Sequence, residues 1–367
     1  MLSSQQRHRL KRIIPFGVIW FALGLVYCVV DMGIRADSPV GPTVTAPYDP
    51  VTAFLTICPC SILMGMAMGA LEVYVLKHRF RKRSFAGHIA IKTAIYTMAI
   101  VVFIVLVRIA YNSLYRHLPI TDAGIIRSQL DTFGSVYFWS IVAFAGTVVA
   151  VSLLFAELSH HMGHGVLRNY FTGRYRKPQQ EERIFMFLDM KSSTTIAEQM
   201  GHVSYFGLLN RYYADMTDAI LASSGEIHQY VGDEVVITWT LRDGLRDNAC
   251  VECFFRIKAQ LESQAPHYLK TFGRVPGFKA GLHCGHVTTG EIGSVRKDII
   301  FTGDVMNTTA RIQSLCNESG VDLLISEALL KRLALNDSCR VREIGVRELK
   351  GKDERVKLFT VTKADKH

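Results

Sequence analysis

The chain has 367 residues, of which 49% are hydrophobic, and a formal net charge of +10. It is longer than one ordinary domain, and its apolar residues gather in about the first 160 positions, which predicts a membrane half followed by a soluble half. The excess charge belongs to the first half, with about 18 Lys and Arg against about 7 Asp and Glu before residue 181. These basic residues lie beside apolar segments rather than on a folded basic domain, so nucleic acid is excluded as a partner.

Four apolar segments are long enough to cross a lipid bilayer as helices, which takes about 20 residues each. Basic residues gather before the first segment and between the second and third, so the positive-inside rule predicts a multi-pass protein with both termini in the cytoplasm. The first segment lacks a small-residue cleavage site, which favours a retained anchor over a signal peptide. We therefore predict an all-α transmembrane domain of four helices over residues 1–156. The segments are Ile13–Val30, Val51–Leu76, Ile89–Ile109 and Phe133–Ala156.

Charged and histidine side chains near the ends of these segments admit simple interpretations. Lys92 and Arg108 lie near the ends of the third segment, where long side chains are expected to reach the membrane interface. His160, His161 and His164 follow the fourth segment, and His160 and His164 stand one helical turn apart. They could bind a metal or haem or sense pH. Because no second set of ligands is visible, we interpret them as polar residues at the interface.

A linker over residues 157–180 is expected to continue the fourth helix and then break before a soluble domain over 181–367. The soluble domain alternates strand and helix patterns, which predicts an α/β sandwich with a mixed or antiparallel sheet and no dinucleotide-binding or P-loop glycine pattern. The predicted strands are Arg183–Asp189, Glu226–Val231, Glu234–Thr240, Phe278–His286, Asp298–Phe301, Leu323–Ser326, Arg340–Leu349 and Val356–Val361. The predicted helices are Ser193–Ser223, with a break near Gly201, then Leu245–Ser263 and Asp304–Glu318.

Two carboxylates lie at the ends of neighbouring predicted strands. Asp189 ends one strand, and Asp233 lies in a tight hairpin turn, where Gly232 lets the backbone come close to a ligand. Two such carboxylates can share one or two Mg²⁺ ions, which would bridge the phosphates of a nucleoside triphosphate and could activate a ribose hydroxyl for attack. The sequence therefore predicts a metal site at Asp189, Met190 and Asp233.

The residues after Asp189 are predicted to bind a triphosphate. They open a helix, whose free N–H groups and hydroxyls suit phosphate oxygens, although they could equally serve as a helix cap. The candidate residues are Lys191, Ser192, Ser193 and Thr194.

Two polar side chains on a later predicted helix also suit phosphate chemistry. Asn307 and Arg311 are four residues apart and project from one helix face. The amide could orient the ribose, and the guanidinium could stabilise charge that develops on the α-phosphate. Lys350, in the turn of the last predicted hairpin, could bind phosphate. Catalytic roles are therefore predicted for Asn307, Arg311 and Lys350.

With these motifs in this order, the segment from about Glu181 to Thr362 resembles the catalytic domain of the class III nucleotidyl cyclases, in a membrane-anchored bacterial form. The resemblance implies a ferredoxin-like α/β domain that works as a head-to-tail homodimer in the inner membrane. It implies that Asp189 and Asp233 of one protomer hold two Mg²⁺ or Mn²⁺ ions per site, while Asn307, Arg311 and Lys350 come from the other. The expected product is a 3′,5′-cyclic nucleotide, with release of pyrophosphate.

The sequence departs from the family at two residues that contact the purine. Adenylate cyclases usually place a Lys four residues before the second metal-binding Asp and an Asp or Thr seven residues before the Asn, whereas this chain has Gln229 and Ile300. The Gln229 amide can bond adenine or, flipped, guanine, and Ile300 cannot hydrogen-bond through its side chain. We predict ATP as the substrate, with GTP as the alternative and with weaker discrimination between them than a Lys/Asp pair would give.

Two other functions remain open from the sequence. Gly232-Asp233-Glu234 echoes the signature of diguanylate cyclases, but the Asn-Arg pair and the Leu349-Lys350-Gly351 turn are foreign to that family. A receptor whose cyclase-like domain only binds nucleotide is the second alternative. The intact Asp and Asn/Arg positions favour an active enzyme over this receptor.

Overall fold

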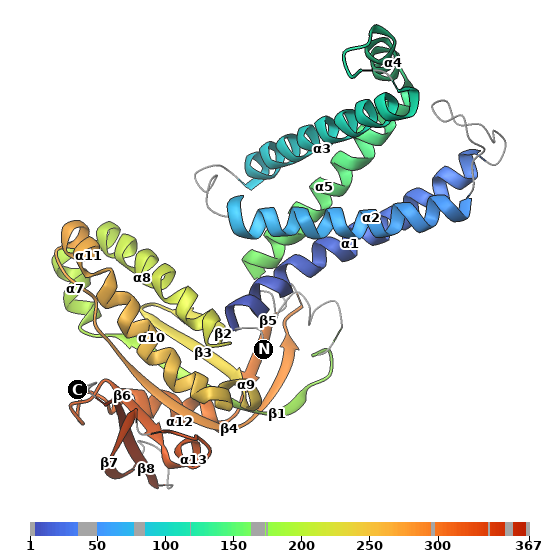
Figure 1. The fold of residues 1–367 in the computed structure, drawn as a ribbon. Coiled ribbons are helices and arrows are strands. Elements are labelled where there is room, and N and C mark those ends of the chain that lie inside the picture. The colour runs from blue at the N-terminus through green and yellow to red at the C-terminus, as the bar shows by residue number, and fades with distance from the viewer. Residues whose placement is uncertain are drawn as a thin grey trace. The chain divides into compact units, whose positions relative to one another are not determined.

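A computed structural model describes residues 4–35, 50–76, 85–117, 119–162, 173, 175–294, 298–336, 338–348 and 355–364. The chain divides into two compact units, one over Arg9–Leu167 and one that includes Arg168–His367. The first is all helical and the second is built on a mixed sheet (Figure 1).

The first unit contains the four predicted apolar helices and one short helix that was not predicted. Its elements are α1 (Ser4–Arg35), α2 (Pro50–Leu71), a π-helical turn η1 (Glu72–Leu76), α3 (Phe85–Arg116), α4 (Ala123–Phe133) and α5 (Val136–Met162). Windows in α1, in α2 with η1, in α3 and in α5 are long and apolar enough to cross a membrane. The α4 helix is amphipathic, and its N-cap Asp122 accepts a hydrogen bond of 2.8 Å from the Gly124 N–H, a local signal that could have been read from the sequence.

Buried side chains from α1, α2, α3 and α5 meet in one cluster. The α1 and α2 helices approach especially closely at Gly65, where an added Cβ would lie 2.7 Å from Trp20 and 2.8 Å from the Phe16 carbonyl oxygen. Small residues permit such contacts between apolar helices. The cluster consists of Phe16, Met68, Tyr96, Val149 and Leu153.

The Lys92 side chain, which was expected to reach the membrane interface, is buried between helices. Its ammonium group forms an ion pair with Glu72, which also accepts a 3.0 Å hydrogen bond from the Tyr96 hydroxyl. Lys92 is 3% exposed and Glu72 is 9% exposed. The π-helical turn that contains Glu72 follows α2 directly, and the pair thus joins α3 to the end of α2. The side chain of Arg108 lies outside the described residues.

The second unit is built on an eight-stranded sheet in the order β2-β3-β1-β4-β6-β8-β7, with β5 paired to β4. The β4–β6 pair is parallel and the others are antiparallel. The strands are β1 (Gln179–Met190), β2 (Glu226–Val231), β3 (Glu234–Thr240), β4 (Phe278–Ile292), β5 (Asp298–Thr302), β6 (Leu323–Ser326), β7 (Cys339–Glu348) and β8 (Arg355–Lys363). The first four strands with their connecting helices form the expected ferredoxin-like βαββαβ unit.

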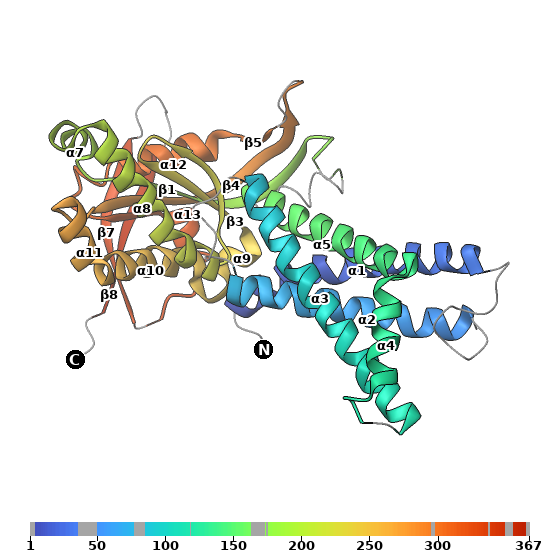
Figure 2. The same cartoon turned by 90° about the horizontal axis from the view of Figure 1, so that it is seen from above.

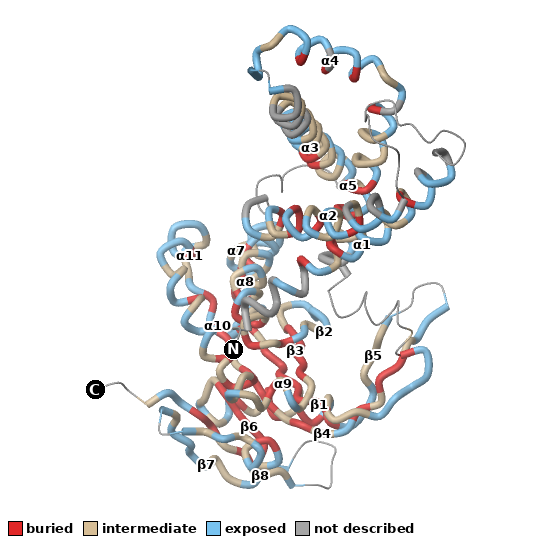
Figure 3. Tube along the Cα trace, turned by 45° about the vertical axis from the view of Figure 1, so that its right-hand side comes forward, coloured by how far each residue is buried: buried red, intermediate tan, exposed pale blue. Residues whose placement is uncertain are grey.

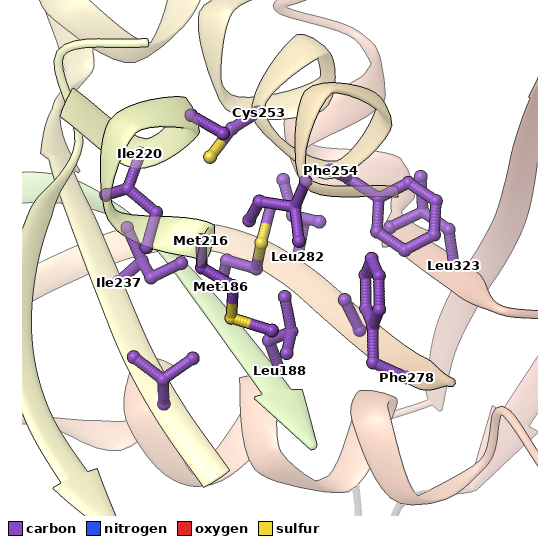
Figure 4. Close-up of a cluster of buried hydrophobic side chains, with 14 of the residues drawn as sticks. Met186, Leu188, Met216, Ile220, Ile237, Cys253, Phe254, Phe278, Leu282 and Leu323 are labelled. Atoms are coloured by element: carbon purple, nitrogen blue, oxygen red, sulfur yellow. The ribbon is translucent and has the colours of Figure 1, made fainter. Parts of the chain in front are cut away.

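Helices cover both faces of the central strands, as Figure 2 shows. The connecting helices are α7 (Ser193–Met200), α8 (His202–Ala222), α9 (Leu241–Leu245), η2 (Arg246–Asn248), α10 (Ala249–Ser263) and α11 (Ala265–Phe272); α12 (Asp304–Ser314) and α13 (Glu327–Leu330) follow β5 and β6. One face of β1 packs on α8 and α10 in the main core (Figure 4). The other face, with Phe185 and Phe187, packs on α12 around Val305. Because both faces are covered, β1 is an almost continuous buried run (Figure 3).

The structure differs from the predicted elements where tertiary contacts extend or end them. The predicted helix 245–263 is interrupted by η2, where Asp247 and Asn248 have positive φ angles. The predicted strand 278–286 continues to Ile292 because β5 pairs with its second half. The predicted helix 304–318 ends at Ser314, and α11 and α13 were not predicted.

The buried ion pair gives a stability prediction. Replacing Lys92→Leu leaves the Glu72 carboxylate without its cation among apolar helices, and we expect the full-length protein in detergent to lose about 3 kcal/mol of unfolding free energy. The double variant Glu72→Leu/Lys92→Leu is expected to recover most of this loss, because apolar pairs of similar size replace buried ion pairs well. Thermal unfolding measures both, with exposed Arg127→Leu as the control. Equal losses in the single and double variants would show that the pairing does not matter.

Candidate active site

The Asp189 and Asp233 side chains meet at one end of the central strands. Asp189 is the penultimate residue of β1 and pairs with Glu234 across β3, so the β2–β3 turn that carries Asp233 lies beside it. Gly232 has a φ of 62°, a conformation that favours glycine, and its carbonyl accepts a 2.8 Å hydrogen bond from the Tyr213 hydroxyl. The turn is thereby anchored to α8, and the two carboxylates that the sequence predicted to be neighbours are brought together.

Negative charge is concentrated at this edge. Burial, followed by the hydrogen bond and the charge of Asp233, raises the pKa of Asp189 above its usual range, while Lys279 and Gln313 oppose the rise. Burial, with the charges of Asp189 and Asp233, raises the pKa of Glu234 to about 7. Two carboxyls with raised pKa values therefore lie beside the charge of Asp233, and a bound cation would relieve the repulsion between them.

The carboxylate pair fits a divalent ion held partly by substrate. Within the described residues, no group of three or more His, Cys, Asp and Glu side chains could hold a metal ion. Mg²⁺ does not need such a group, because it commonly binds one or two carboxylates together with substrate phosphates and water. Met190, the third predicted metal residue, ends β1, and its side chain is buried in the main core, 1% exposed. Asp189 and Asp233 therefore offer the side-chain ligands.

The predicted phosphate-binding residues occupy the start of α7. Ser192 is the N-cap residue, has a φ of 55° and makes no side-chain cap hydrogen bond, and Ser193 and Thr194 form the first turn. Lys191 forms an ion pair with Asp322, and its N–H donates to the Gly277 carbonyl at 2.9 Å. This ion pair occupies the ammonium group of Lys191. The helix start remains the better candidate for phosphate.

Asn307 and Arg311 do not reach the carboxylates of their own chain. Both lie on α12, where Asn307 is exposed and Arg311 is half-buried. Among the described residues, no hydrogen bond or ion pair joins either side chain to Asp189 or Asp233, and the buried Arg311 Nη1 has no hydrogen-bond partner. A buried guanidinium N–H without a partner costs free energy, so this nitrogen is available to a group outside the described chain.

Gln229 faces the same side of the sheet as Asp189 because of a bulge in β2. The β2–β3 register shifts between Ile227 and Gln229, and Gln229 pairs with Val236, which lies in the α12-facing cluster. Ile300 lies on β5 and pairs with Gly290 on β4. Its neighbour Phe301 packs on Phe185. Because side chains alternate along a strand, Ile300 and Phe301 point to opposite faces. The structure therefore does not place Gln229 and Ile300 on one surface of a single chain.

Some predicted residues fall outside the described part of the chain. Lys350 and the Leu349–Gly351 turn fall between β7 and β8, in a segment outside the described residues. His164 also lies outside the described residues. His160 and His161 lie in the last turns of α5, with side chains that are not described.

Sequence reasoning missed two residues that contact Asp189. Lys279 on β4 pairs with Asp189 in register, and its Nζ lies 3.5 Å from Asp189 Oδ2. The Gln313 amide on α12 donates to the same oxygen at 3.2 Å. The position of Lys279 at the start of a predicted strand was a usable signal for the first. No local pattern marked Gln313.

Comparison with known proteins gives consistent matches. A family model described as the adenylate and guanylate cyclase catalytic domain matches residues 176–363. Adenylate cyclase 2 of Rhizobium meliloti (strain 1021) is 32% identical over 302 residues, which cover 82% of this chain and 82% of that protein, so the match extends into the N-terminal unit. An adenylate cyclase of Anabaena cylindrica is 30% identical over 182 residues, 48% of this chain and 36% of that protein. A solved bacterial light-regulated adenylyl cyclase shares the fold, with a TM-score of 0.51 and 23% identity over 64% of this chain and 67% of that one.

The raised pKa of Glu234 gives a prediction for the metal-free protein. The pKa of the Glu234 carboxyl is higher in the folded protein than its ordinary 4.5. Its contribution to the free energy of unfolding is therefore lost as pH rises from about 4.5 to about 7. Glu234→Gln is therefore expected to be more stable than wild type at pH 8 by about 1 kcal/mol, after allowance for solvent screening, and to approach it at pH 5. Thermal unfolding in EDTA across this range measures the difference. Exposed Glu198→Gln is the control, and a Glu234→Gln effect independent of pH would contradict the prediction.

Proposed function

Because the chain belongs to the class III family of adenylate and guanylate cyclases, we propose that it is a membrane-bound adenylate cyclase that converts ATP to 3′,5′-cyclic AMP and pyrophosphate. The observation that carries this proposal is the pair of neighbouring carboxylates, Asp189 and Asp233, at the end of the buried strand β1. Both curated relatives described above are named adenylate cyclases, which favours ATP over GTP.

Asp189 and Asp233 would hold the divalent ions on which the chemistry depends. Two Mg²⁺ or Mn²⁺ ions, when bound, would neutralise phosphate charge and make the ribose 3′-hydroxyl more acidic. The 3′-oxygen then bonds to the α-phosphorus while the bond to pyrophosphate breaks. The free N–H groups at the start of α7, at Ser193 and Thr194, would bind phosphate oxygens.

The site would be completed by a second copy of the chain. Asn307 would orient the ribose and Arg311 would stabilise the charge that develops on the α-phosphate, both from the partner protomer. This arrangement is supported by the absence, among the described residues, of contacts from Asn307 and Arg311 to their own Asp189 and Asp233, and by the unpartnered Arg311 Nη1. Lys350 would join them to bind phosphate. A homodimer would then have two equivalent sites.

Four helices in the N-terminal half support anchoring in the cell membrane. The proposed organisation is a membrane domain over 1–156, a linker over 157–180 and the catalytic domain over 181–367; the linker is not helical to its end, because β1 begins at Gln179. The excess of basic residues in the first turns of α1, before its apolar stretch, and between α2 and α3 supports placing both termini in the cytoplasm. The membrane half and the linker would then set how the two catalytic domains face each other.

The first test measures cyclic nucleotide formation by the purified full-length protein with Mg²⁺ or Mn²⁺, with ATP and GTP offered separately. We expect cyclic AMP from ATP, no product from Asp233→Ala, and a rate about 100- to 1000-fold lower for Arg311→Ala, because a preorganised charge donor to the transition state is lost. Exposed Arg340→Ala is the matched control. Cyclic GMP as the main product would make the protein a guanylate cyclase, and no product from a dimeric preparation would favour a nucleotide-binding receptor.

The second test concerns the choice of purine. Gln229→Lys restores the residue that adenylate cyclases usually place there, and we expect the ratio of kcat/KM for ATP over GTP to rise about 10-fold or more, because a site built for hydrogen bonds rejects a base that leaves them unpaired. Competition between the two nucleotides measures this ratio. An unchanged ratio would show that other residues select the base.

A further inference from the structure

The buried side of α12 carries one amide side chain, that of Gln313, where the helix packs on the sheet. Val305, Thr309 and Gln313 recur every four residues on the buried side of α12, and Gln313 is 6% exposed. A buried amide is costly unless it is hydrogen-bonded. Its amide nitrogen donates to Asp189 Oδ2 at 3.2 Å.

The backbone geometry fixes this contact. An added Cβ at Gly281 on β4 would lie 2.5 Å from the backbone nitrogen of Gln313, so the helix backbone rests directly on the strand. Gly281 pairs with Phe187, two residues before Asp189 on the same face of β1. Next to Gln313, Ile312 is buried in a cluster with Leu324. The Gln313 side chain therefore has little freedom to move away from Asp189.

We propose that Gln313 is a positioning residue that holds the metal-binding carboxylate of Asp189 in its own chain; this inference rests on the proposed function. Gln313 and Lys279 both contact Oδ2 of Asp189, from α12 and from β4. Two side chains of the same chain thus hold this oxygen of the carboxylate in place. Such supporting hydrogen bonds orient ligands and strengthen metal binding.

The same helix would serve both active sites of a dimer through different faces. Successive residues of an α-helix turn by about 100°, so Gln313 projects about 200° from Arg311. Arg311 is thereby free to meet the partner while Gln313 holds Asp189 of its own chain. Gln313 should consequently act in cis, and Asn307 and Arg311 in trans.

Direct metal binding tests the positioning role. We expect full-length Gln313→Met, which keeps the side-chain shape but removes the donor, to bind Mn²⁺ about 10-fold more weakly than wild type when free Mn²⁺ is followed by electron paramagnetic resonance. Thr309→Val is the matched control, because Thr309 is buried on the same face and its hydroxyl donates only to the Val305 carbonyl of the same helix. Unchanged Mn²⁺ affinity in Gln313→Met would overturn the proposal, as would an equal loss in Thr309→Val.

Mixed dimers test the action in cis. A dimer of one Asp189→Ala chain and one Asn307→Ala chain, isolated with two affinity tags, keeps one complete site, which uses Asp189 of the Asn307→Ala chain. Gln313→Met added to the Asn307→Ala chain should raise the Mn²⁺ concentration needed for half-maximal activity about 10-fold. Gln313→Met added to the Asp189→Ala chain should leave the Mn²⁺ concentration needed for half-maximal activity unchanged.

The outcomes separate this inference from the proposed function. A similar effect in both chains, or an effect confined to the Asp189→Ala chain, would show that Gln313 acts by shaping α12 and would overturn the positioning role. If the mixed dimer has no more activity than its parent homodimers, the shared site is wrong. The Mn²⁺ titration of the Gln313→Met homodimer would still decide the role of Gln313.

Discussion

The crowding of carboxylates at the end of β1 is the constraint around which the catalytic half is arranged. The register between β1 and β3 sets Asp189 opposite Glu234, and the adjoining turn adds Asp233. Burial and mutual repulsion raise the pKa values of Asp189 and Glu234, so the arrangement works against the stability of the ion-free protein. The strain of such a cluster is a reason to expect function here, because a structural role would be met more cheaply by apolar residues.

The α12 helix shows how one element can meet two demands. Its buried face must match the sheet, and Gly281 allows contact so close that the choice of side chain at Gln313 is restricted. Its other face carries Asn307 and Arg311, which make no contact with the carboxylates of the same chain among the described residues. The buried face of α12 therefore has its packing partners within the chain, whereas Asn307 and Arg311 have no contact with the carboxylates of their own chain among the described residues.

The N-terminal half also contains buried charged groups, and these pair with each other within that half of the chain. Lys92 and Glu72 are both buried, and the Tyr96 hydroxyl adds a third contact. Ionisable groups within apolar helices are expensive, and pairing lowers that cost only when the geometry is held by packing. The pair consequently favours one arrangement of α3 against the end of α2, which apolar contacts by themselves specify less sharply.

The sequence by itself determined the order of the strands and of the longer helices, because alternation, apolar runs and turn residues are local signals. It gave the bounds of β2, β3 and β6 and brought Asp189 and Asp233 to neighbouring strand ends. Only the tertiary structure decided which side chains contact each other. Gln313 is 124 residues from Asp189, and Lys92 is 20 residues from Glu72. No local pattern encodes such contacts, since they depend on strand register and on how closely a helix can approach a sheet.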